Sequence, residues 1–180
     1  MGEDEAGTAK IVRERREAAT PIVRSFGGRL VKTMGDGVLL EFPSVVAAVE
    51  CAIAIQALTP QLNRELVEMD APEVSFGIGL NTGEAVAAHF GGGRRRQYDV
   101  VGDTVNVGAR LCSAAGRGEI ILSDAVLSRT TSPPPVEPVG HIELKGVSRE
   151  LRLWRVVAPE SASLSLSVTA AENAVTVPET

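Results

Sequence analysis

The sequence is poor in aromatic residues, cysteine and histidine, and each scarcity narrows the class of protein. Aromatic residues make up only 3% of the 180 residues, so a core must be built from the aliphatic side chains that dominate the 44% apolar content. The two cysteines, Cys51 and Cys112, lie in predicted helices beside apolar residues, which favours buried free thiols over a disulfide or a metal pair. The two histidines, His89 and His141, are far apart and match no metal-ligand spacing.

Long apolar runs and an excess of basic charge are also absent. Glu50 and Gln56 interrupt the best candidate for a membrane span, and the acidic N-terminus has no apolar core of a signal peptide. The formal net charge of −5 argues against a nucleic-acid partner. The basic cluster 94–96 indicates a solvated hairpin loop, with contact to nucleotide phosphates or to a partner chain as the alternative. We therefore expect a cytoplasmic protein that binds neither nucleic acid nor membrane.

Hydrophobic periodicity and turn residues predict one α+β domain with a mostly antiparallel sheet and flanking helices. Pro60 is expected either to end the second helix or to begin a further short helical piece. The expected elements are a helix over 3–25, a hairpin over 29–42, a helix capped by Ser44, a strand over 73–81, a hairpin over 84–99, a helix over 103–115 ended by Gly116, a strand over 119–122, a helix over 123–129 and a closing antiparallel pair over 136–145 and 151–157. The domain is thus assigned to 1–157, and 158–180 is predicted to be a disordered tail.

The segment Tyr98–Arg110 places an acid, an amide and a guanidinium at fixed offsets across a loop and the start of a helix. Asp103 or Thr104 can cap that helix, because either side-chain oxygen can accept an orphan backbone N–H. Asn106 and Arg110 are four residues apart, so both project from one helical face. An amide and a guanidinium aimed at one point suit the charge that develops on a phosphate.

A second motif lies in the hairpin over 29–42. Gly35-Asp36-Gly37 predicts a tight turn between two apolar-rich strands, with Asp36 at its tip, where a carboxylate is open to solvent and to a metal ion. Lys32 lies four residues earlier on the incoming strand. Taken alone, an Asp-Gly turn indicates only a turn.

These two motifs, together with the segment 74–84, occur in the order and spacing of the class III nucleotide cyclase catalytic domain. The chain closely resembles the bacterial members of this adenylate/guanylate cyclase family from about residue 1 to residue 157. The resemblance implies a ferredoxin-like nucleotide cyclase fold with two nucleotide sites at the interface of a head-to-tail homodimer. It also implies an adenylate cyclase, which converts ATP to 3′,5′-cyclic AMP and pyrophosphate for intracellular signalling.

The resemblance assigns metal and base recognition to three residues. Asp36 is implied to be one of two aspartates that hold two divalent ions, Mg²⁺ or Mn²⁺, and carboxylate oxygens suit such hard cations. Lys32 and Asp99 match the pair that recognises adenine, with lysine donating to the ring N1 and aspartate accepting from the exocyclic amine. Guanine presents a carbonyl at the latter position, so GTP is the less favoured substrate.

Three further residues are assigned to the phosphates and the ribose by the same resemblance. Asn106 and Arg110 match the transition-state residues, of which asparagine orients the ribose and arginine takes the charge that grows on the α-phosphate. Lys145 lies where the family has a lysine near the β- and γ-phosphates.

One departure from the family pattern concerns the N-terminus. Family members begin with a strand that carries the first metal aspartate, and residues 1–8 resemble the sequence that follows it, so we expect this N-terminal strand to be missing. The alternative to an active cyclase is therefore a catalytically impaired, nucleotide-binding regulatory module. Such a module could also work in a heterodimer with a complete cyclase. A third hypothesis, a scaffold whose motifs serve packing and turns, treats Asp99, Asn106 and Arg110 as solvated surface.

Overall fold

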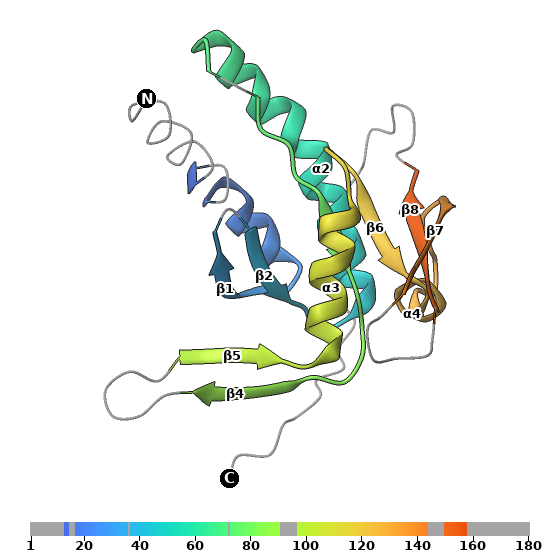
Figure 1. The fold of residues 1–180 in the computed structure, drawn as a ribbon. Helices are drawn as coiled ribbons and strands as arrows, with labels where there is room; N and C mark the ends of the chain where they lie inside the picture. The colour runs from blue at the N-terminus through green and yellow to red at the C-terminus, as the bar shows by residue number, and fades with distance from the viewer. Residues whose placement is uncertain are drawn as a thin grey trace.

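The computed structural model describes residues 13–14, 17–35, 37–71, 73–90, 97–143 and 150–157. Its largest sheet has four strands in the order β3-β6-β8-β7 (Figure 1). β3 (Ile78–Leu80) is parallel to β6 (Ile120–Ser123), whereas β8 (Glu150–Val156) is antiparallel to both β6 and β7 (Val136–Glu143). The mixture of helices with mainly antiparallel strand pairs confirms the predicted α+β class.

Two β-hairpins form separate two-stranded sheets. The first pairs β1 (Arg29–Met34) with β2 (Gly37–Glu41), and the second pairs β4 (Val86–Phe90) with β5 (Gln97–Val101). Figure 1 shows the second hairpin below the first, with β5 leading directly into a helix. Both hairpins confirm the prediction from the turn residues.

Residues 17–25 are helical, and three further helices follow along the chain. They are α2 (Val45–Glu68), α3 (Asp103–Ala114) and α4 (Asp124–Arg129). The Ser44 hydroxyl accepts a hydrogen bond from the Ala47 N–H at 3.0 Å, which confirms the predicted cap of α2. The predicted elements over 3–12 and 158–180 lie outside the described residues.

Pro60 lies inside α2, so the prediction that it ends this helix or starts a separate piece is wrong. A proline within a helix removes one backbone hydrogen bond. Here the neighbouring Thr59 is buried, and its hydroxyl donates to the Ile55 carbonyl at 2.9 Å, within the same turn. The burial of α2 residues on both sides of Pro60, such as Ala52 and Leu66, keeps the helix continuous.

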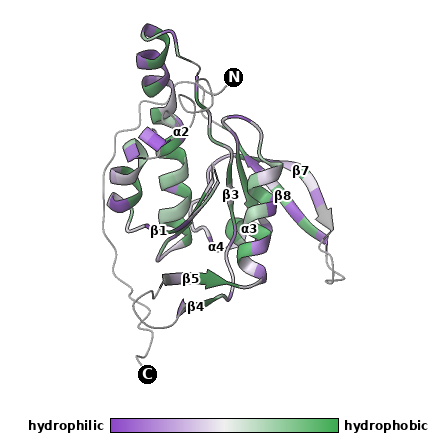
Figure 2. Cartoon of the chain, turned by 60° about the vertical axis from the view of Figure 1, so that its left-hand side comes forward, coloured by the Kyte–Doolittle hydropathy of each residue, from purple (hydrophilic) through white to green (hydrophobic). Residues whose placement is uncertain are grey.

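α2 is also long and apolar enough, by length and composition, to cross a membrane. Glu50 and Gln56 therefore do not exclude a membrane span on the basis of composition alone. Figure 2 colours much of the α2 ribbon green, the colour of apolar residues, with purple turns between. In this structure, however, Val49, Ala52 and Leu66 of α2 are buried within the domain. The core helix of a folded domain can be as long and as apolar as a membrane span.

The core lies on both faces of β6, whose four residues are all buried. Because successive strand residues point to opposite faces, Ile120 and Leu122 pack with Val49 and Ala52 of α2 on one side. Ile121 packs on the other side in a cluster with residues of α3 and β8, namely Val107, Leu111 and Leu153. α2 and α3 therefore cover opposite faces of the sheet, and the aliphatic core predicted from the composition is confirmed.

The strand predicted over 73–81 is wrong in its first half, because only Ile78–Leu80 pairs as a strand. Side chains of α2 satisfy the preceding backbone in place of a neighbouring strand. The Asn63 amide accepts from the Val74 N–H at 3.0 Å and donates to the Val74 carbonyl at 2.8 Å. Gln56 donates to the Phe76 carbonyl at 2.7 Å. These contacts depend on the tertiary packing of α2, which the period-two pattern of this segment does not report.

The caps of α3 also differ from the prediction. Its N-cap is Gly102, at φ +140°, and no side chain caps it. Thr104 instead donates its hydroxyl to the Glu84 carbonyl at 2.6 Å, which ties the first turn of α3 to the loop before β4. At the other end, the Glu119 carboxylate accepts from the Gly116 N–H at 2.7 Å, so the predicted left-handed cap at Gly116 is replaced by a side-chain contact.

Gly79 lets α3 lie against β3 at backbone distance. A Cβ atom on Gly79 would lie 2.1 Å from the Cys112 backbone nitrogen and 2.6 Å from the Leu111 carbonyl carbon. The absence of a side chain at Gly79 therefore permits the close approach of α3 to β3. Cys112 itself is exposed, so the prediction of a buried thiol holds for Cys51 and is wrong for Cys112.

Candidate active site

Lys32 and Asp99, 67 residues apart in sequence, form an ion pair between β1 and β5. The Lys32 ammonium lies 2.8 Å from Asp99 Oδ1 and 2.9 Å from Oδ2. Both side chains are 25% exposed, so they are held in place and still open to a ligand. The hydrogen bond from Lys32, aided by one from the Val100 N–H, holds the pKa of Asp99 below its usual range.

A β-bulge determines which way Lys32 points. The register of the first hairpin pairs Leu30 with Leu40 but Lys32 with Leu39, so Val31 is an extra residue. Arg29, paired with Glu41, and Lys32, paired with Leu39, therefore share one face of the hairpin, although they are three positions apart along the chain. Val31 itself is 9% exposed and adds to the buried interior.

A second polar cluster lies beside this pair and also joins the hairpins. We call Arg29, Glu41 and Tyr98 the tyrosine triad. The Arg29 Nε lies 2.6 Å from Glu41 Oε1, and the Tyr98 hydroxyl donates to Glu41 Oε2 at 2.7 Å. Arg29 also donates to the Tyr98 hydroxyl, and its guanidinium carbon lies 4.1 Å from the ring centroid. On β4, His89 meets the same ring edge-on at a centroid distance of 5.5 Å.

Burial and the Glu41 carboxylate raise the pKa of Tyr98, so the hydroxyl keeps its proton and donates. The hydrogen bond to Glu41 likewise raises the pKa of Arg29. Arg29 and Glu41 belong to neither of the motifs from which the site was predicted. Their one signal is that they are directly opposite in the hairpin, where opposite charges attract.

Asn106 and Arg110 lie on α3 at the predicted four-residue spacing, and both are exposed. The start of this helix is fixed by contacts from the loop that follows β3. The Asn81 amide donates to the Thr104 carbonyl at 3.0 Å, and a Cβ atom on Gly83 would lie 2.7 Å from Thr104 Oγ1. Because β5 runs into α3 through Gly102, the strand that carries Asp99 also sets where this helix begins.

The structure thus joins Lys32 to Asp99 and exposes Asn106 and Arg110 on one helix. Asp36 and Lys145, the predicted metal and phosphate ligands, lie outside the described residues. Within the described ranges, no group of three or more histidine, cysteine, aspartate or glutamate side chains could hold a metal ion.

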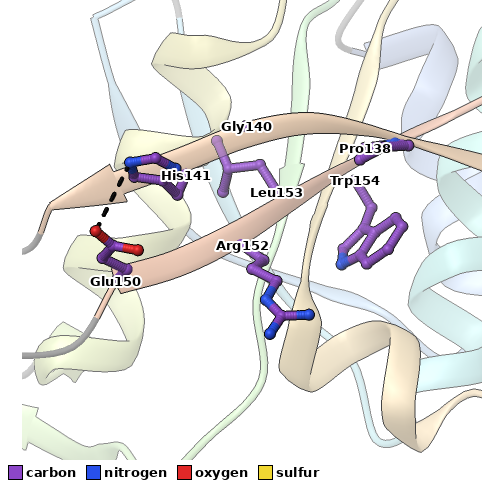
Figure 3. Close-up of a pocket in the computed structure, with 7 residues that line it drawn as sticks. All are labelled: Pro138, Gly140, His141, Glu150, Arg152, Leu153 and Trp154. Carbon is purple, nitrogen blue, oxygen red and sulfur yellow. Dashed lines mark ion pairs between the residues drawn. The ribbon is translucent and has the colours of Figure 1, made fainter.

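A hollow of about 310 Å³ lies on β7 and β8 (Figure 3). His141 Nε2 lies 3.8 Å from Glu150 Oε1 at one end of it, and Trp154 lies at the other. It is lined by Pro138, Gly140, His141, Glu150, Arg152, Leu153 and Trp154. None of these residues belongs to the predicted site, so the hollow is separate from the Lys32–Asp99 pair.

The family model described as "Adenylate and Guanylate cyclase catalytic domain" matches residues 10–157, and the chain belongs to this family. The resemblance stated from the motifs is therefore confirmed.

Curated and solved relatives agree with this family. The chain is 32% identical over 140 residues to an adenylate cyclase of Streptomyces coelicolor, which covers 76% of this chain and 32% of that protein. It spans about a quarter or less of the length of several other curated relatives. Among solved structures, the guanylyl cyclase Cya2 matches with a TM-score of 0.80 at 27% identity, over 91% of this chain and 87% of that one. The adenylyl cyclase CyaB from P. aeruginosa matches with a TM-score of 0.75 at 26% identity, over 86% and 83%.

Proposed function

We propose that this domain is an adenylate cyclase that converts ATP to 3′,5′-cyclic AMP and pyrophosphate. The observation that carries the proposal is the Lys32–Asp99 pair, with its nitrogen and oxygens 2.8–2.9 Å apart. Overall similarity does not decide the base, because the matched structures include a guanylyl cyclase and an adenylyl cyclase. The choice of nucleotide therefore rests on the chemistry of these two side chains.

The pair presents a donor and an acceptor that suit adenine. An ammonium has three donors and a carboxylate about four acceptor positions, so each group can bind a base while the two stay in contact. Lys32 donates to adenine N1, and Asp99 accepts from the exocyclic amine. Guanine presents an N–H at N1 and a carbonyl at the neighbouring carbon, so both groups would face a like partner. Each unsatisfied group costs roughly 1–3 kcal/mol, which favours ATP.

Asn106 and Arg110 serve the reaction itself in this proposal. The ribose 3′-oxygen forms a bond to the α-phosphorus, the bond from that phosphorus to the bridging oxygen of pyrophosphate breaks, and the 3′-hydroxyl loses its proton. Asn106 orients the ribose, and Arg110 stabilises the negative charge on the α-phosphate. A dependence on Mg²⁺ or Mn²⁺ belongs to the proposal, with Asp36 as its predicted ligand and Lys145 as the predicted contact to the β- and γ-phosphates. A bound divalent ion would supply charge neutralisation at the phosphates.

We further propose that two copies of the chain complete the site head to tail. Large apolar side chains are exposed on the two hairpins that carry the Lys32–Asp99 pair. Leu30 is 54% exposed and Met34 45% on β1, and the cross-strand partners Val86 and Val101 are 62% and 40% exposed. A second copy would cover such a surface. A single copy in solution at the concentrations that support activity would contradict this part of the proposal.

The test is a comparison of cyclic AMP and cyclic GMP production from ATP and GTP, with Mg²⁺ or Mn²⁺, for the native chain and for Lys32→Glu combined with Asp99→Cys. The native chain is expected to prefer ATP, and the double variant to shift towards GTP, because its glutamate accepts from guanine N1–H. Glu137→Gln is the control, since it removes a surface carboxylate that pairs with Arg155 on the other sheet. An unchanged ATP/GTP ratio in the double variant would refute the base assignment.

If no product forms, binding of 3′-deoxyATP separates the remaining readings. This nucleotide lacks the attacking hydroxyl, so it reports binding without reaction. Tight binding of 3′-deoxyATP by a chain that does not turn over ATP would favour a nucleotide-binding regulatory module over a cyclase. The absence of binding would favour the scaffold hypothesis.

A further inference from the structure

Two cations of β1 hold two adjacent residues of β5. Lys32 pairs with Asp99, and Arg29 pairs with Tyr98, the preceding residue. Adjacent residues of a strand project to opposite faces, whereas the bulge at Val31 places both cations on the same face of their own hairpin. The two contacts therefore hold β5 from opposite sides and resist rotation of the strand about its axis.

The tyrosine triad is built as a closed ring of contacts. Glu41 uses both carboxylate oxygens, one for the Arg29 Nε at 2.6 Å and one for the Tyr98 hydroxyl at 2.7 Å, and Arg29 closes the ring on that same hydroxyl. An exposed ion pair by itself contributes little to stability, and Arg29 is 58% exposed. The three contacts of the triad, together with the stacking of the Arg29 guanidinium on the Tyr98 ring, instead constrain the position of β5 relative to β1.

We propose that Tyr98, Arg29 and Glu41 are positioning residues for nucleotide selection: the triad fixes β5 relative to β1 and thereby fixes the Lys32 ammonium and Asp99 carboxylate at the spacing that discriminates adenine from guanine. This inference rests on the proposed function, which it deepens. None of the three side chains contacts the base in this scheme. They act through the Lys32–Asp99 pair. Their loss is therefore expected to change the ratio of the affinities for adenine and guanine nucleotides, and to have little effect on the stability of the fold.

The variants follow from the contacts. Tyr98→Phe removes the hydroxyl and keeps the ring that Arg29 and His89 contact, so the fold is retained. Tyr98→Leu removes the ring as well and is expected to give the larger effect in the same direction. Glu137→Gln is again the matched control, because it breaks an exposed arginine–carboxylate contact of 2.7 Å at Arg155, on β7 and β8, away from the pair.

The first measurement is the ratio of dissociation constants for 3′-deoxyGTP and 3′-deoxyATP. Tyr98→Phe is expected to lower the preference for the adenine nucleotide by about 3- to 10-fold, the range of one lost hydrogen bond. The control is expected to leave the ratio unchanged, and all variants should unfold within a few degrees of the native chain. An unaltered ratio in both Tyr98 variants, in a chain that does discriminate, would overturn the inference and leave the proposed function intact.

A second measurement does not depend on nucleotide. The pKa of the Asp99 carboxyl can be followed by carbon NMR in the ligand-free chain. Tyr98→Phe is expected to raise this pKa towards its ordinary value, because Lys32 no longer stays at hydrogen-bond distance. A native chain that binds the two nucleotides equally would remove the proposed function, whereas an Asp99 pKa that is the same in native and Tyr98→Phe chains would overturn the triad's positioning role.

Discussion

The four-stranded sheet and the two hairpins are stabilised by different kinds of contact. Around the sheet, Leu111 of α3 and Ile121 of β6 are fully buried and Leu122 is 1% exposed, so the layers are held by aliphatic packing. The hairpins are joined to each other by polar contacts at the surface, with Lys32 and Asp99 each a quarter exposed. The comparison suggests a division of roles: the packed sheet stabilises the domain, whereas the polar contacts between the hairpins serve nucleotide selection in the proposed function. Substitutions in each region should therefore affect different measurements.

Gly79→Ala is expected to have the largest effect on stability, because it acts where α3 packs on the four-stranded sheet. Its Cβ would lie 2.1 Å from the Cys112 nitrogen, which is backbone and cannot rotate away. Overpacking of this kind typically costs about 1–3 kcal/mol or more, so the melting temperature should fall and α3 should shift. Thermal unfolding followed by circular dichroism measures the change.

Gly108→Ala is the matched control on the helix that Gly79 contacts. The new Cβ would meet only the Asn81 Cβ at 3.9 Å, and Gly108 is inside α3. Alanine is favoured over glycine in a helix interior by roughly 0.5–1 kcal/mol, so this variant should be more stable. If Gly79→Ala were as stable as Gly108→Ala, the close approach of α3 to β3 would be wrong.

Arg110→Ala is expected to affect mainly activity. Loss of a donor to the developing charge lowers kcat by about 100- to 1000-fold, whereas the contacts of an exposed side chain add little to stability, so the melting temperature should change far less than in Gly79→Ala. Arg152→Ala on β8 is the control, because this arginine is also exposed and lies outside the proposed site. Equal activity of the two variants would remove Arg110 from the mechanism. Steady-state cyclic AMP production gives the comparison.

The two thiols should differ in reactivity according to the region that surrounds them. Burial raises the pKa of Cys51 to about 11, so at pH 8 very little of it is thiolate, and its side chain is enclosed in the core. Cys112 is exposed. A thiol reagent should label Cys112 in the folded domain and reach Cys51 only on unfolding. Mass spectrometry that finds equal labelling of both would contradict the packing of α2.

The smallest expected effect is the response of the hairpins to acid. Lys32 holds the pKa of Asp99 below its ordinary value of about 3.9. A carboxyl with a depressed pKa stabilises the folded state above the ordinary value, and that contribution is lost as the pH falls through the lowered one. The difference in melting temperature between the native chain and Asp99→Asn should therefore shrink below about pH 4. A difference that stays constant down to pH 2 would mean that the ion pair does not form.

The sequence predicted local structure better than it predicted contacts between distant segments. Turn residues located both hairpins, and Ser44 was correctly placed as a cap, because such signals act within a few residues. The extended segment before β3 was misjudged, since Asn63 and Gln56 satisfy its backbone from another element. Pro60 was misjudged because tertiary burial keeps α2 continuous.

The candidate site shows the same division. The family motifs pointed to Lys32 and Asp99 as partners, and the structure brings them into contact. Their neighbours Arg29 and Glu41 carry no motif, and their link to Tyr98 arises only where β5 meets the first hairpin. A network assembled from three strands leaves no periodic trace in the sequence.

The bulge at Val31 also bears on which changes of sequence the first hairpin can accept. A regular ladder through all the residues of β1 would pair Val31 with Leu39 and place Lys32 on the face of the hairpin opposite to Arg29. Every side chain would still be present, and the hairpin could still form, but the two cations would no longer share one face. A substitution between Arg29 and Lys32 that favours the regular ladder over the bulge is therefore expected to move the Lys32 ammonium away from Asp99, although it removes neither side chain.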